Sequence, residues 1–223
     1  TDDKKTLLAV SELAQADEPN GFIHSFRIEG EELVEVSKLT THGQAPCHIE
    51  IDKTGTYAIV SNYVGGVATV YRIMQGGVLV EASRYTIAED IKAGKPSWLH
   101  SANFSPDNQH VVIADKGMDR IWLFKLDPET GELNPNLRLW VRFEEGDGPR
   151  HATWSADGRF LYVINELSNT IKVIAHDQTA NSFTIIQTIP TLPADYAGTS
   201  YCADIHLHPN GKFLYGSNRG HNS

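Results

Sequence analysis

One short pattern occurs five times in this chain of 223 residues: a polar turn, then a run of apolar residues, then a polar pair. The pair follows the turn by seven and eight positions, as Asn165-Glu166 follows Gly158 and Asn218-Arg219 follows Gly211. The turns are anchored at positions 5, 55, 108, 158 and 211, so successive anchors are 50, 53, 50 and 53 residues apart. A near-constant step of this size predicts a toroidal or solenoid array with one β-sheet unit in each repeat.

The residues between two anchors have the periodicity of β-strands. In the repeat that starts at Gly158, apolar or alternating runs occupy residues 160–164, 170–174 and 183–186, and the next repeat supplies 202–207. The preceding repeat has matching runs at 110–114, 121–126 and 137–143. The best candidate for a helix, residues 89–93, is short and is followed by Gly-Lys-Pro. We therefore predict an all-β protein, a β-propeller with blades of four antiparallel strands.

The length of the chain sets the number of blades. At about 50 residues per blade, residues 1–223 are expected to form a single β-propeller domain of about four blades plus a partial blade. The first copy of the pattern lacks a preceding strand, and the last copy lacks its outer strands. We therefore expect a domain that is incomplete at both ends, a fragment of a larger ring.

Charge and composition argue against several classes of partner. The formal net charge is −9, whereas phosphate backbones and anionic membranes need a basic surface, so we expect neither nucleic acid nor a membrane as a partner. No apolar run is long enough to cross a membrane, and no signal-peptide pattern follows Thr1. The two cysteines, Cys47 and Cys202, are too few for a disulfide framework, which favours a reducing, cytoplasmic location. The oligomeric state is left open.

The repeats place polar side chains from different blades at one opening. The strands before and after each anchor form an antiparallel hairpin, so residues eight before and eight after the anchor meet at its open end, near the axis of a propeller. The residues eight before the anchors are Cys47, His100, Arg150 and Ala203, and the next residues are His48, Ser101, His151 and Asp204. The pairs after the anchors are Asn62-Tyr63, Asp115-Lys116, Asn165-Glu166 and Asn218-Arg219. Different blades thus direct His, Arg, Glu and Arg side chains toward a shared mouth.

These polar positions have both a structural and a functional interpretation. The recurring Asn or Asp seven after the anchor could tie down the next turn through side-chain to backbone hydrogen bonds. Surface polarity alone would more often select Lys, Ser or Thr than two arginines, a histidine and a glutamate at matched depth. We therefore predict a catalytic group of His100, Arg150, Glu166 and Arg219. The predicted substrate-binding residues are His48, Asn62, Asp115, His151 and Asp204.

Several stretches resemble the signature segments of a known family. They are His-Ser-Ala-Asn-Phe-Ser-Pro-Asp at 100–107, Asp-Lys-Gly-Met-Asp-Arg-Ile at 115–121, Gly-Pro-Arg-His at 148–151, Asn-Glu-Leu at 165–167 and Ala-Asp-Ile-His at 203–206. In this order and spacing they resemble the lactonase propellers, which include the propeller-type 6-phosphogluconolactonases of bacteria and the fungal carboxymuconate-lactonising enzyme. The resemblance implies a ring of seven blades. It also implies that His100, Arg150, Glu166 and Arg219 match the active-site His, Arg, Glu and Arg of the lactonising enzyme.

The same four side chains could open a lactone without a metal or another cofactor. Glu166 or His100 could activate the water, with the other one donating a proton to the leaving alkoxide. Arg150 and Arg219 suit a carbonyl oxyanion, a carboxylate or a phosphate, and they are expected to keep Glu166 ionised and His100 neutral. Positions 206 and 208 are the histidine pair whose spacing could share a metal ion, but position 208 begins a turn at the far end of its hairpin. No metal site is therefore predicted.

The predicted function is hydrolysis of a sugar-acid lactone, with the resemblance favouring 6-phosphogluconolactone, a small anionic substrate. One alternative is cycloisomerisation of a muconate-like diacid by the same residues. Another alternative is a propeller without catalytic activity, whose upper face binds a protein or a carbohydrate. A binding platform does not need Glu166 beside two arginines, and an isomerase does not need access for water.

Overall fold

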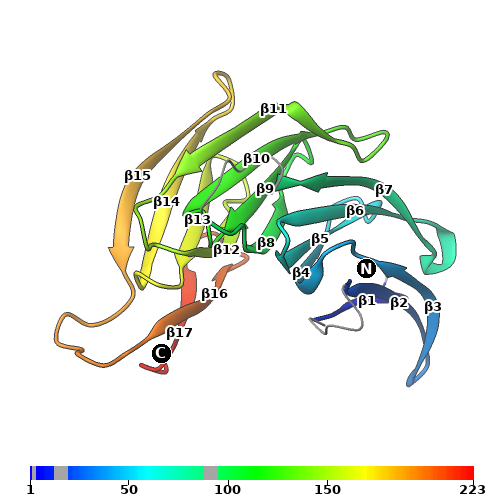
Figure 1. Cartoon of the computed structure of the whole chain (residues 1–223), viewed down its shortest axis with the longest axis horizontal. Helices are drawn as coiled ribbons and strands as arrows, with labels where there is room; N and C mark the ends of the chain where they lie inside the picture. Colours follow the sequence, from blue (N-terminus) through cyan, green and yellow to red (C-terminus); the bar gives the residue numbers. More distant parts are fainter. Residues whose placement is uncertain (2–3, 13–19, 88–94) are drawn as a thin grey trace.

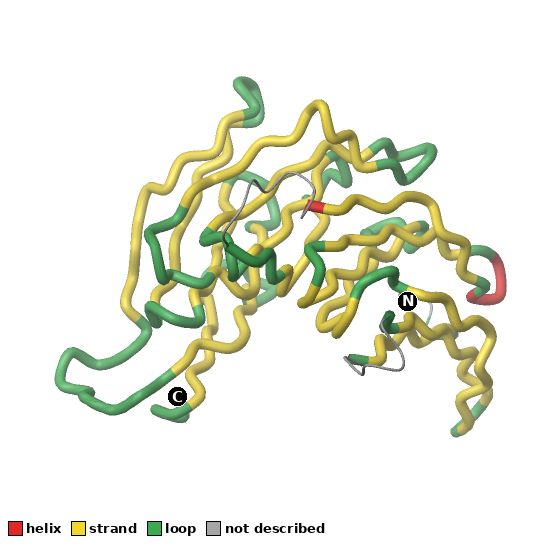
Figure 2. Tube along the Cα trace, viewed as in Figure 1, coloured by secondary structure: helices red, strands yellow, loops and turns green. Residues whose placement is uncertain are grey.

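The computed structural model describes residues 1, 4–12, 20–87 and 95–223, and their regular structure is almost entirely β-strand (Figures 1 and 2). The strands form five antiparallel sheets, here called blades 1 to 5, in which each strand pairs with its neighbour in sequence. Blade 1 contains β1 (Thr6–Ser11), β2 (Phe22–Glu29) and β3 (Glu32–Thr40); blade 2 contains β4 (Gln44–Ile51), β5 (Tyr57–Val64), β6 (Val67–Ile73) and β7 (Leu79–Thr86). Blade 3 contains β8 (Leu99–Phe104), β9 (His110–Asp115), β10 (Arg120–Leu126) and β11 (Leu133–Arg142). Blade 4 contains β12 (Pro149–Trp154), β13 (Phe160–Asn165), β14 (Thr170–Asp177) and β15 (Ser182–Pro190), and blade 5 contains β16 (Tyr201–Leu207) and β17 (Leu214–Arg219).

The blades fan out along an arc, with blade 1 at one end and blade 5 at the other (Figure 1). The strands β4, β8, β12 and β16 are each the first strand of their sheet, and consecutive members of this series contact one another. The strand before each anchor is therefore the innermost strand, as the repeat pattern predicts. A short 3₁₀ helix, η1 (Gln75–Gly77), joins β6 to β7. Within the described ranges, no helix has the length and apolar character needed to span a lipid bilayer.

The apolar core lies between neighbouring blades. Along β9, Val111 and Ile113 belong to the core shared with blade 2, whereas Val112 and Ala114 belong to the core shared with blade 4. Successive residues of a strand point to opposite faces, so a strand with a blade on each side is apolar at every position. This packing explains the continuous apolar runs after the anchors, which have no polar face.

The anchors are tight turns that require a left-handed backbone. Gly55, Gly158 and Gly211 have φ values of 69°, 68° and 70°, and Asn108 has a φ value of 56°. Glycine and asparagine adopt this conformation at lower cost than other residues, which explains why they occupy four of the five anchors. The predicted strands coincide with β9, β10, β11 and β13 to β16 to within a few residues. The helix candidate at 89–93 lies outside the described residues.

Candidate functional site

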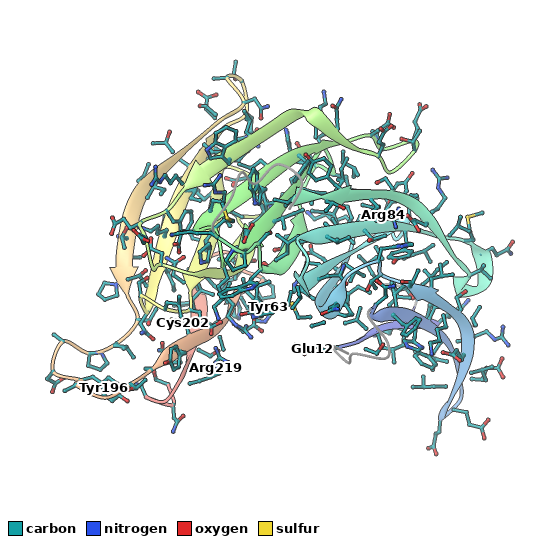
Figure 3. The ribbon with its side chains drawn as sticks, in the orientation of Figure 1. Glu12, Tyr63, Arg84, Tyr196, Cys202 and Arg219 are labelled. Carbon is teal, nitrogen blue, oxygen red and sulfur yellow. The ribbon has the colours of Figure 1, made fainter. Side chains whose placement is uncertain are left out.

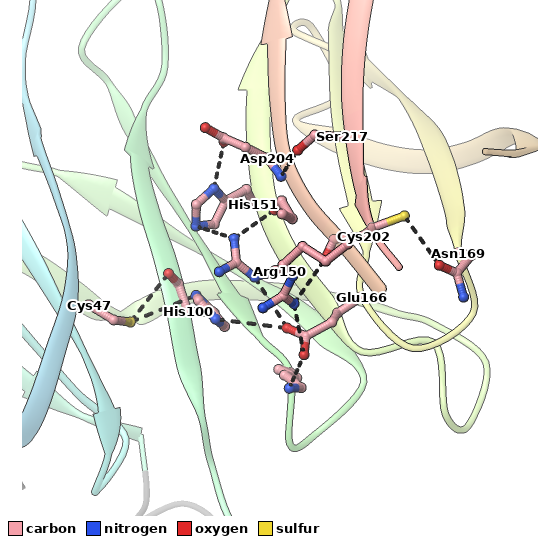
Figure 4. Close-up of polar contacts among 12 residues, drawn as sticks. Cys47, His100, Arg150, His151, Glu166, Asn169, Cys202, Asp204 and Ser217 are labelled. Carbon is pink, nitrogen blue, oxygen red and sulfur yellow. Dashed lines mark hydrogen bonds and ion pairs between the residues drawn. The ribbon is translucent and has the colours of Figure 1, made fainter. Parts of the chain in front are cut away.

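Four side chains from three blades meet around the carboxylate of Glu166 (Figure 4), which makes a group of five residues. Its Oε1 atom lies 2.7 Å from Nζ of Lys116 and 3.2 Å from Nη2 of Arg219. Its Oε2 atom lies 3.2 Å from Nε of Arg150 and 3.9 Å from Nε2 of His100. We call these five residues the Glu166 cluster. The structure thus brings together all four predicted catalytic residues and adds Lys116.

A β-bulge in each of the inner strands β8 and β12 places His100 and Arg150. In β8, Leu99 pairs with Asp115 and Ser101 pairs with Ala114, so His100 between them has no partner in the ladder. Arg150 is skipped in the same way, between Pro149 and His151. A bulge bends the strand and redirects the extra side chain, and bulges are common beside active sites. The simple hairpin expected from the sequence is therefore interrupted at the residue that contributes to the site.

The same interruption occurs in blades 2 and 5. The ladder skips Cys47 in β4, and it is irregular between Cys202 and Ile205 in β16. The position eight before the anchor is thus a bulge in every blade for which the structure has an inner strand. One repeated backbone irregularity therefore directs equivalent side chains of several blades to the mouth.

The cluster holds Glu166 ionised. Burial opposes ionisation of this carboxyl, but the hydrogen bond and charge of Lys116, followed by the charge of Arg219, outweigh burial and lower its pKa. The sequence predicted an ionised Glu166 but attributed it to the arginines alone. Lys116 makes the shortest contact, and its side chain is 12% exposed, so water screens this pair only weakly.

His100 is neutral at physiological pH. Burial is the main cause that lowers its pKa to about 3, and the positive charge of Arg150 adds to it. The predicted neutral imidazole is present, but loss of hydration is a larger cause than the arginines. On its other side, Nδ1 of His100 lies 3.8 Å from Sγ of Cys47, whose pKa burial raises to about 12. This thiol is therefore protonated and unreactive at neutral pH.

Three of the predicted substrate-binding residues lie beside the cluster. Nδ1 of His151 lies 2.7 Å from Oδ1 of Asp204, and the ring centroids of His48 and His151 are 5.3 Å apart. All three residues line a cavity of about 520 Å³ bordered by β4, β8, β12 and β16. His100 and Glu166 do not line this cavity, so it adjoins the cluster at His151 and does not contain it.

The other two predicted substrate-binding residues have structural roles. Asn62 is fully buried and donates hydrogen bonds to the carbonyl oxygens of Thr41 (3.1 Å) and Val67 (2.9 Å). Asp115 is also fully buried, and it accepts hydrogen bonds from Ser97 and Trp98 before β8, from Met118 in the next turn and from Trp122 on β10. Neither side chain is exposed at the mouth, so we do not propose Asn62 or Asp115 as substrate ligands. The structural interpretation of this repeat position applies to both.

Lys116 is the member of the cluster that the sequence prediction missed. It follows its anchor by eight positions, as do Tyr63, Glu166 and Arg219, so the repeat register contained the signal. Its Nζ atom also lies 5.7 Å from the ring centroid of Tyr63. Tyr63 in turn stacks on Trp98 with a centroid distance of 5.8 Å, and Tyr63 and Arg219 lie on the inner side of the arc (Figure 3). These aromatic rings form a wall next to His100.

Replacing Lys116 by Met is expected to raise the pKa of Glu166. Lys116 lowers that pKa by charge and by a hydrogen bond, and Met fills a similar volume without either. Titration of the Glu166 carboxyl carbon by ¹³C NMR measures the shift directly. The control is Lys125→Met, which removes an exposed charge from β10 and should leave the Glu166 titration unchanged. An unchanged titration in Lys116→Met would contradict the assigned role of Lys116.

Comparisons with known proteins agree on one family. The family model described as "Lactonase, 7-bladed beta-propeller" matches residues 1–223. The 6-phosphogluconolactonase of Serratia proteamaculans is 36% identical over 197 residues, which cover 88% of this chain and 57% of that protein. The 6-phosphogluconolactonase of Bacillus subtilis is 30% identical over 184 residues, covering 81% of this chain and 52% of that protein. This chain therefore spans little more than half the length of these relatives.

Solved structures show the same similarity. The periplasmic gluconolactonase of Pseudomonas aeruginosa matches with a TM-score of 0.84 and 28% identity, over 99% of this chain and 64% of that one. A protein from Lactobacillus plantarum matches with a TM-score of 0.84 and 27% identity, over 98% of this chain and 62% of that one.

Proposed function

Because this chain belongs to the family of seven-bladed β-propeller lactonases, we propose that it hydrolyses a sugar-acid lactone, converting 6-phosphogluconolactone to 6-phosphogluconate. Relatives named 6-phosphogluconolactonase support this substrate, and the neighbour named gluconolactonase supports the reaction class. We further propose that residues 1–223 form one propeller domain and that the Glu166 cluster is its catalytic group.

The observation that supports the proposal most directly is the charge of the cluster. Three cations, Lys116, Arg150 and Arg219, surround one carboxylate and a neutral imidazole, in a chain whose formal net charge is −9. A local excess of positive charge in an acidic protein attracts an anionic ligand to one place. Arginines suit both the phosphate of the substrate and the oxyanion that forms during ring opening.

We assign the base to His100. Both oxygens of Glu166 are occupied by ion pairs with Lys116, Arg150 and Arg219, whereas the Nε2 atom of the neutral His100 ring carries a lone pair when Nδ1 holds the proton. Nε2 takes a proton from water as the water oxygen bonds to the carbonyl carbon. Glu166, 3.9 Å from Nε2, stabilises the imidazolium that results.

The arginines act on the oxygen atoms of the substrate. Arg150 and Arg219 stabilise the negative charge on the carbonyl oxygen in the tetrahedral intermediate. When the intermediate collapses, the bond between the carbonyl carbon and the ring oxygen breaks. The imidazolium of His100 then returns its proton to the leaving alkoxide, which gives the open hydroxy acid and the neutral histidine.

We place the activity in the cytoplasm. Cys47 and Cys202 are free thiols, as expected in a reducing compartment, although the Pseudomonas aeruginosa neighbour is described as periplasmic. Fractionation of cells that produce the complete protein tests the location.

The function is tested by adding the complete protein to freshly prepared 6-phosphogluconolactone and following acid release above the spontaneous rate. We expect saturable hydrolysis that exceeds the spontaneous reaction. The control is the protein with Arg159→Ala, which removes an exposed arginine from the anchor turn of blade 4 and should not change the rate. Absence of turnover in the parent protein would reject the lactonase assignment. Turnover of a muconate-like diacid, or no chemistry at all, would then support the isomerase or the binding platform.

A further inference from the structure

Two residues beside the cluster form a chain of contacts with Arg150. His151 follows Arg150 in β12, and Asp204 lies in β16 of the next blade. Nδ1 of His151 is 2.7 Å from Oδ1 of Asp204, and Nε2 of His151 is 3.2 Å from Nη1 of Arg150 (Figure 4). The three side chains form a continuous chain of contacts that ends at Glu166.

The partners of His151 determine which of its nitrogens carries the proton. An ionised carboxylate can only accept hydrogen bonds, so Nδ1 must donate to Asp204. A guanidinium can only donate, so Nε2 must accept from Arg150. His151 is therefore the neutral tautomer protonated at Nδ1. Burial, which lowers its pKa, is consistent with a neutral ring.

Other charged or titratable groups around His151 agree with this state. Asp204 has its pKa lowered to about 2: burial opposes ionisation, but the hydrogen bonds from His151, the backbone of Ile205 and His206 together outweigh it, so the carboxylate is ionised. Its second oxygen, Oδ2, lies 2.9 Å from Nε2 of His206. The rings of His48 and His100 each contact the His151 ring edge-on with a centroid distance of 5.3 Å. Both of these histidines have pKa values lowered to about 3, mainly by burial, so they add no charge.

Some hydrogen-bond donors of the Arg150 guanidinium have partners in the described part of the structure, and others are free. Nη1 donates to the carbonyl oxygen of Ala203 at 2.6 Å and to His151, which uses both of its hydrogens. Nε is buried and lies 3.2 Å from Glu166 as an ion pair without hydrogen-bond geometry. Among the described residues, the hydrogen bonds and ion pairs of this guanidinium involve Nη1 and Nε, and none involves Nη2. Two hydrogens therefore remain for an oxygen of the substrate.

We propose that Asp204 and His151 are positioning residues that hold Arg150 with Nη2 free for the substrate. This inference rests on the proposed lactone hydrolysis, and it replaces the substrate-binding role predicted for His151 and Asp204. Asp204 fixes the tautomer of His151, and His151 accepts the hydrogen bond that orients the guanidinium. Neither residue needs to touch the substrate.

The test is a double-mutant cycle between positions 150 and 151. His151→Phe keeps an aromatic ring against His48 and His100 but removes both nitrogens, so kcat should fall about 10- to 30-fold, part of the effect of losing one oxyanion donor, with little change in KM. His151→Gln offers a side-chain oxygen to Arg150 and should keep kcat within about threefold of the parent. In an Arg150→Ala background, His151→Phe should have no further effect, because it acts through Arg150. The control is His24→Phe, a change on β2 of blade 1, which should leave kcat and KM unchanged.

Each outcome of the cycle either supports the proposal or overturns it. An equal loss from His151→Phe in both backgrounds, or a loss expressed mainly in KM, means that His151 contacts the substrate itself. Failure of His151→Gln to restore activity means that the hydrogen bond to Arg150 is not what matters.

Two measurements without substrate separate this proposal from the proposed function. ¹⁵N NMR of the histidines should find His151 protonated at Nδ1 at neutral pH, and a proton on Nε2 would overturn the proposal. A crystal structure of the His151→Phe variant should show Arg150 in a new rotamer, and an unmoved Arg150 would also overturn it. If both results are as expected but the parent protein has no lactonase activity, the proposed function fails while the positioning of Arg150 stands.

Discussion

Replacing Glu166 by Gln is expected to lower kcat for lactone hydrolysis by about 10³-fold, within the range for loss of a residue that supports a general base. Gln has the size of Glu but no charge, so the imidazolium that forms on His100 loses the anion 3.9 Å away. The same change leaves Lys116, Arg150 and Arg219 without their shared counter-ion. The mouth becomes more positive, so KM for an anionic lactone should fall. Initial rates over a range of substrate concentrations separate the two effects.

The combination of a lower kcat and a lower KM makes this prediction specific. Loss of a residue that only binds substrate raises KM, and general damage to the fold lowers the amount of active enzyme without changing KM. Glu35→Gln is the control, because Glu35 lies on β3 of blade 1 and contacts His24. Unchanged kcat in Glu166→Gln would remove Glu166 from the mechanism.

The fold is predictable from sequence because the repeat records packing on both sides of each blade. A strand such as β9 contributes alternate residues to two different cores, so its whole run is apolar and its position after each anchor is constant. The anchors themselves are visible because a left-handed turn selects Gly or Asn. Both signals are local in the sequence, so they can be recognised without knowledge of the contacts between blades.

The grouping of His100, Arg150, Glu166 and Arg219 is predictable for the same reason. Equivalent positions of equivalent hairpins reach the same end of the ring, whatever their side chains are. The bulges are not predictable in this way, because a bulge is one unpaired residue and no residue type at position 100 or 150 marks it. The sequence therefore locates the mouth but not the backbone irregularity that directs the side chains into it.

Burial accounts for the remaining differences between the sequence prediction and the structure. The pKa of His100 is low mainly because the ring is buried, which depends on blades that pack around it and not on a neighbouring motif. Asn62 and Asp115 have the polar side chains of a binding site and the repeat position next to one, yet both are fully buried under turns. Residue type and register cannot distinguish a buried carboxylate that holds a turn from an exposed one that meets a ligand.

Replacing Asp115 by Ala is expected to lower the free energy of unfolding by about 3–5 kcal/mol, because buried donors left without an acceptor each cost about 1–3 kcal/mol. Asp115 is fully buried, and its two oxygens accept from Ser97 Oγ (2.7 Å), Trp98 N (3.0 Å), Met118 N (3.2 Å) and Trp122 Nε1 (3.1 Å). Alanine provides no acceptor for these donors, which remain buried and unpaired. Urea unfolding followed by tryptophan fluorescence measures the loss.

Comparison with a second aspartate tests whether the burial of the Asp115 carboxylate, and not its charge alone, accounts for the loss of stability. Asp127 is also an aspartate in a turn and also accepts from backbone N–H groups, those of Glu129 and Thr130, but it is exposed. Water can replace the carboxylate there, so Asp127→Ala is expected to destabilise the protein much less than Asp115→Ala. Similar losses from the two variants would contradict a structural role that depends on burial. A stable Asp115→Ala protein with a raised KM for the lactone would instead return Asp115 to the substrate-binding residues.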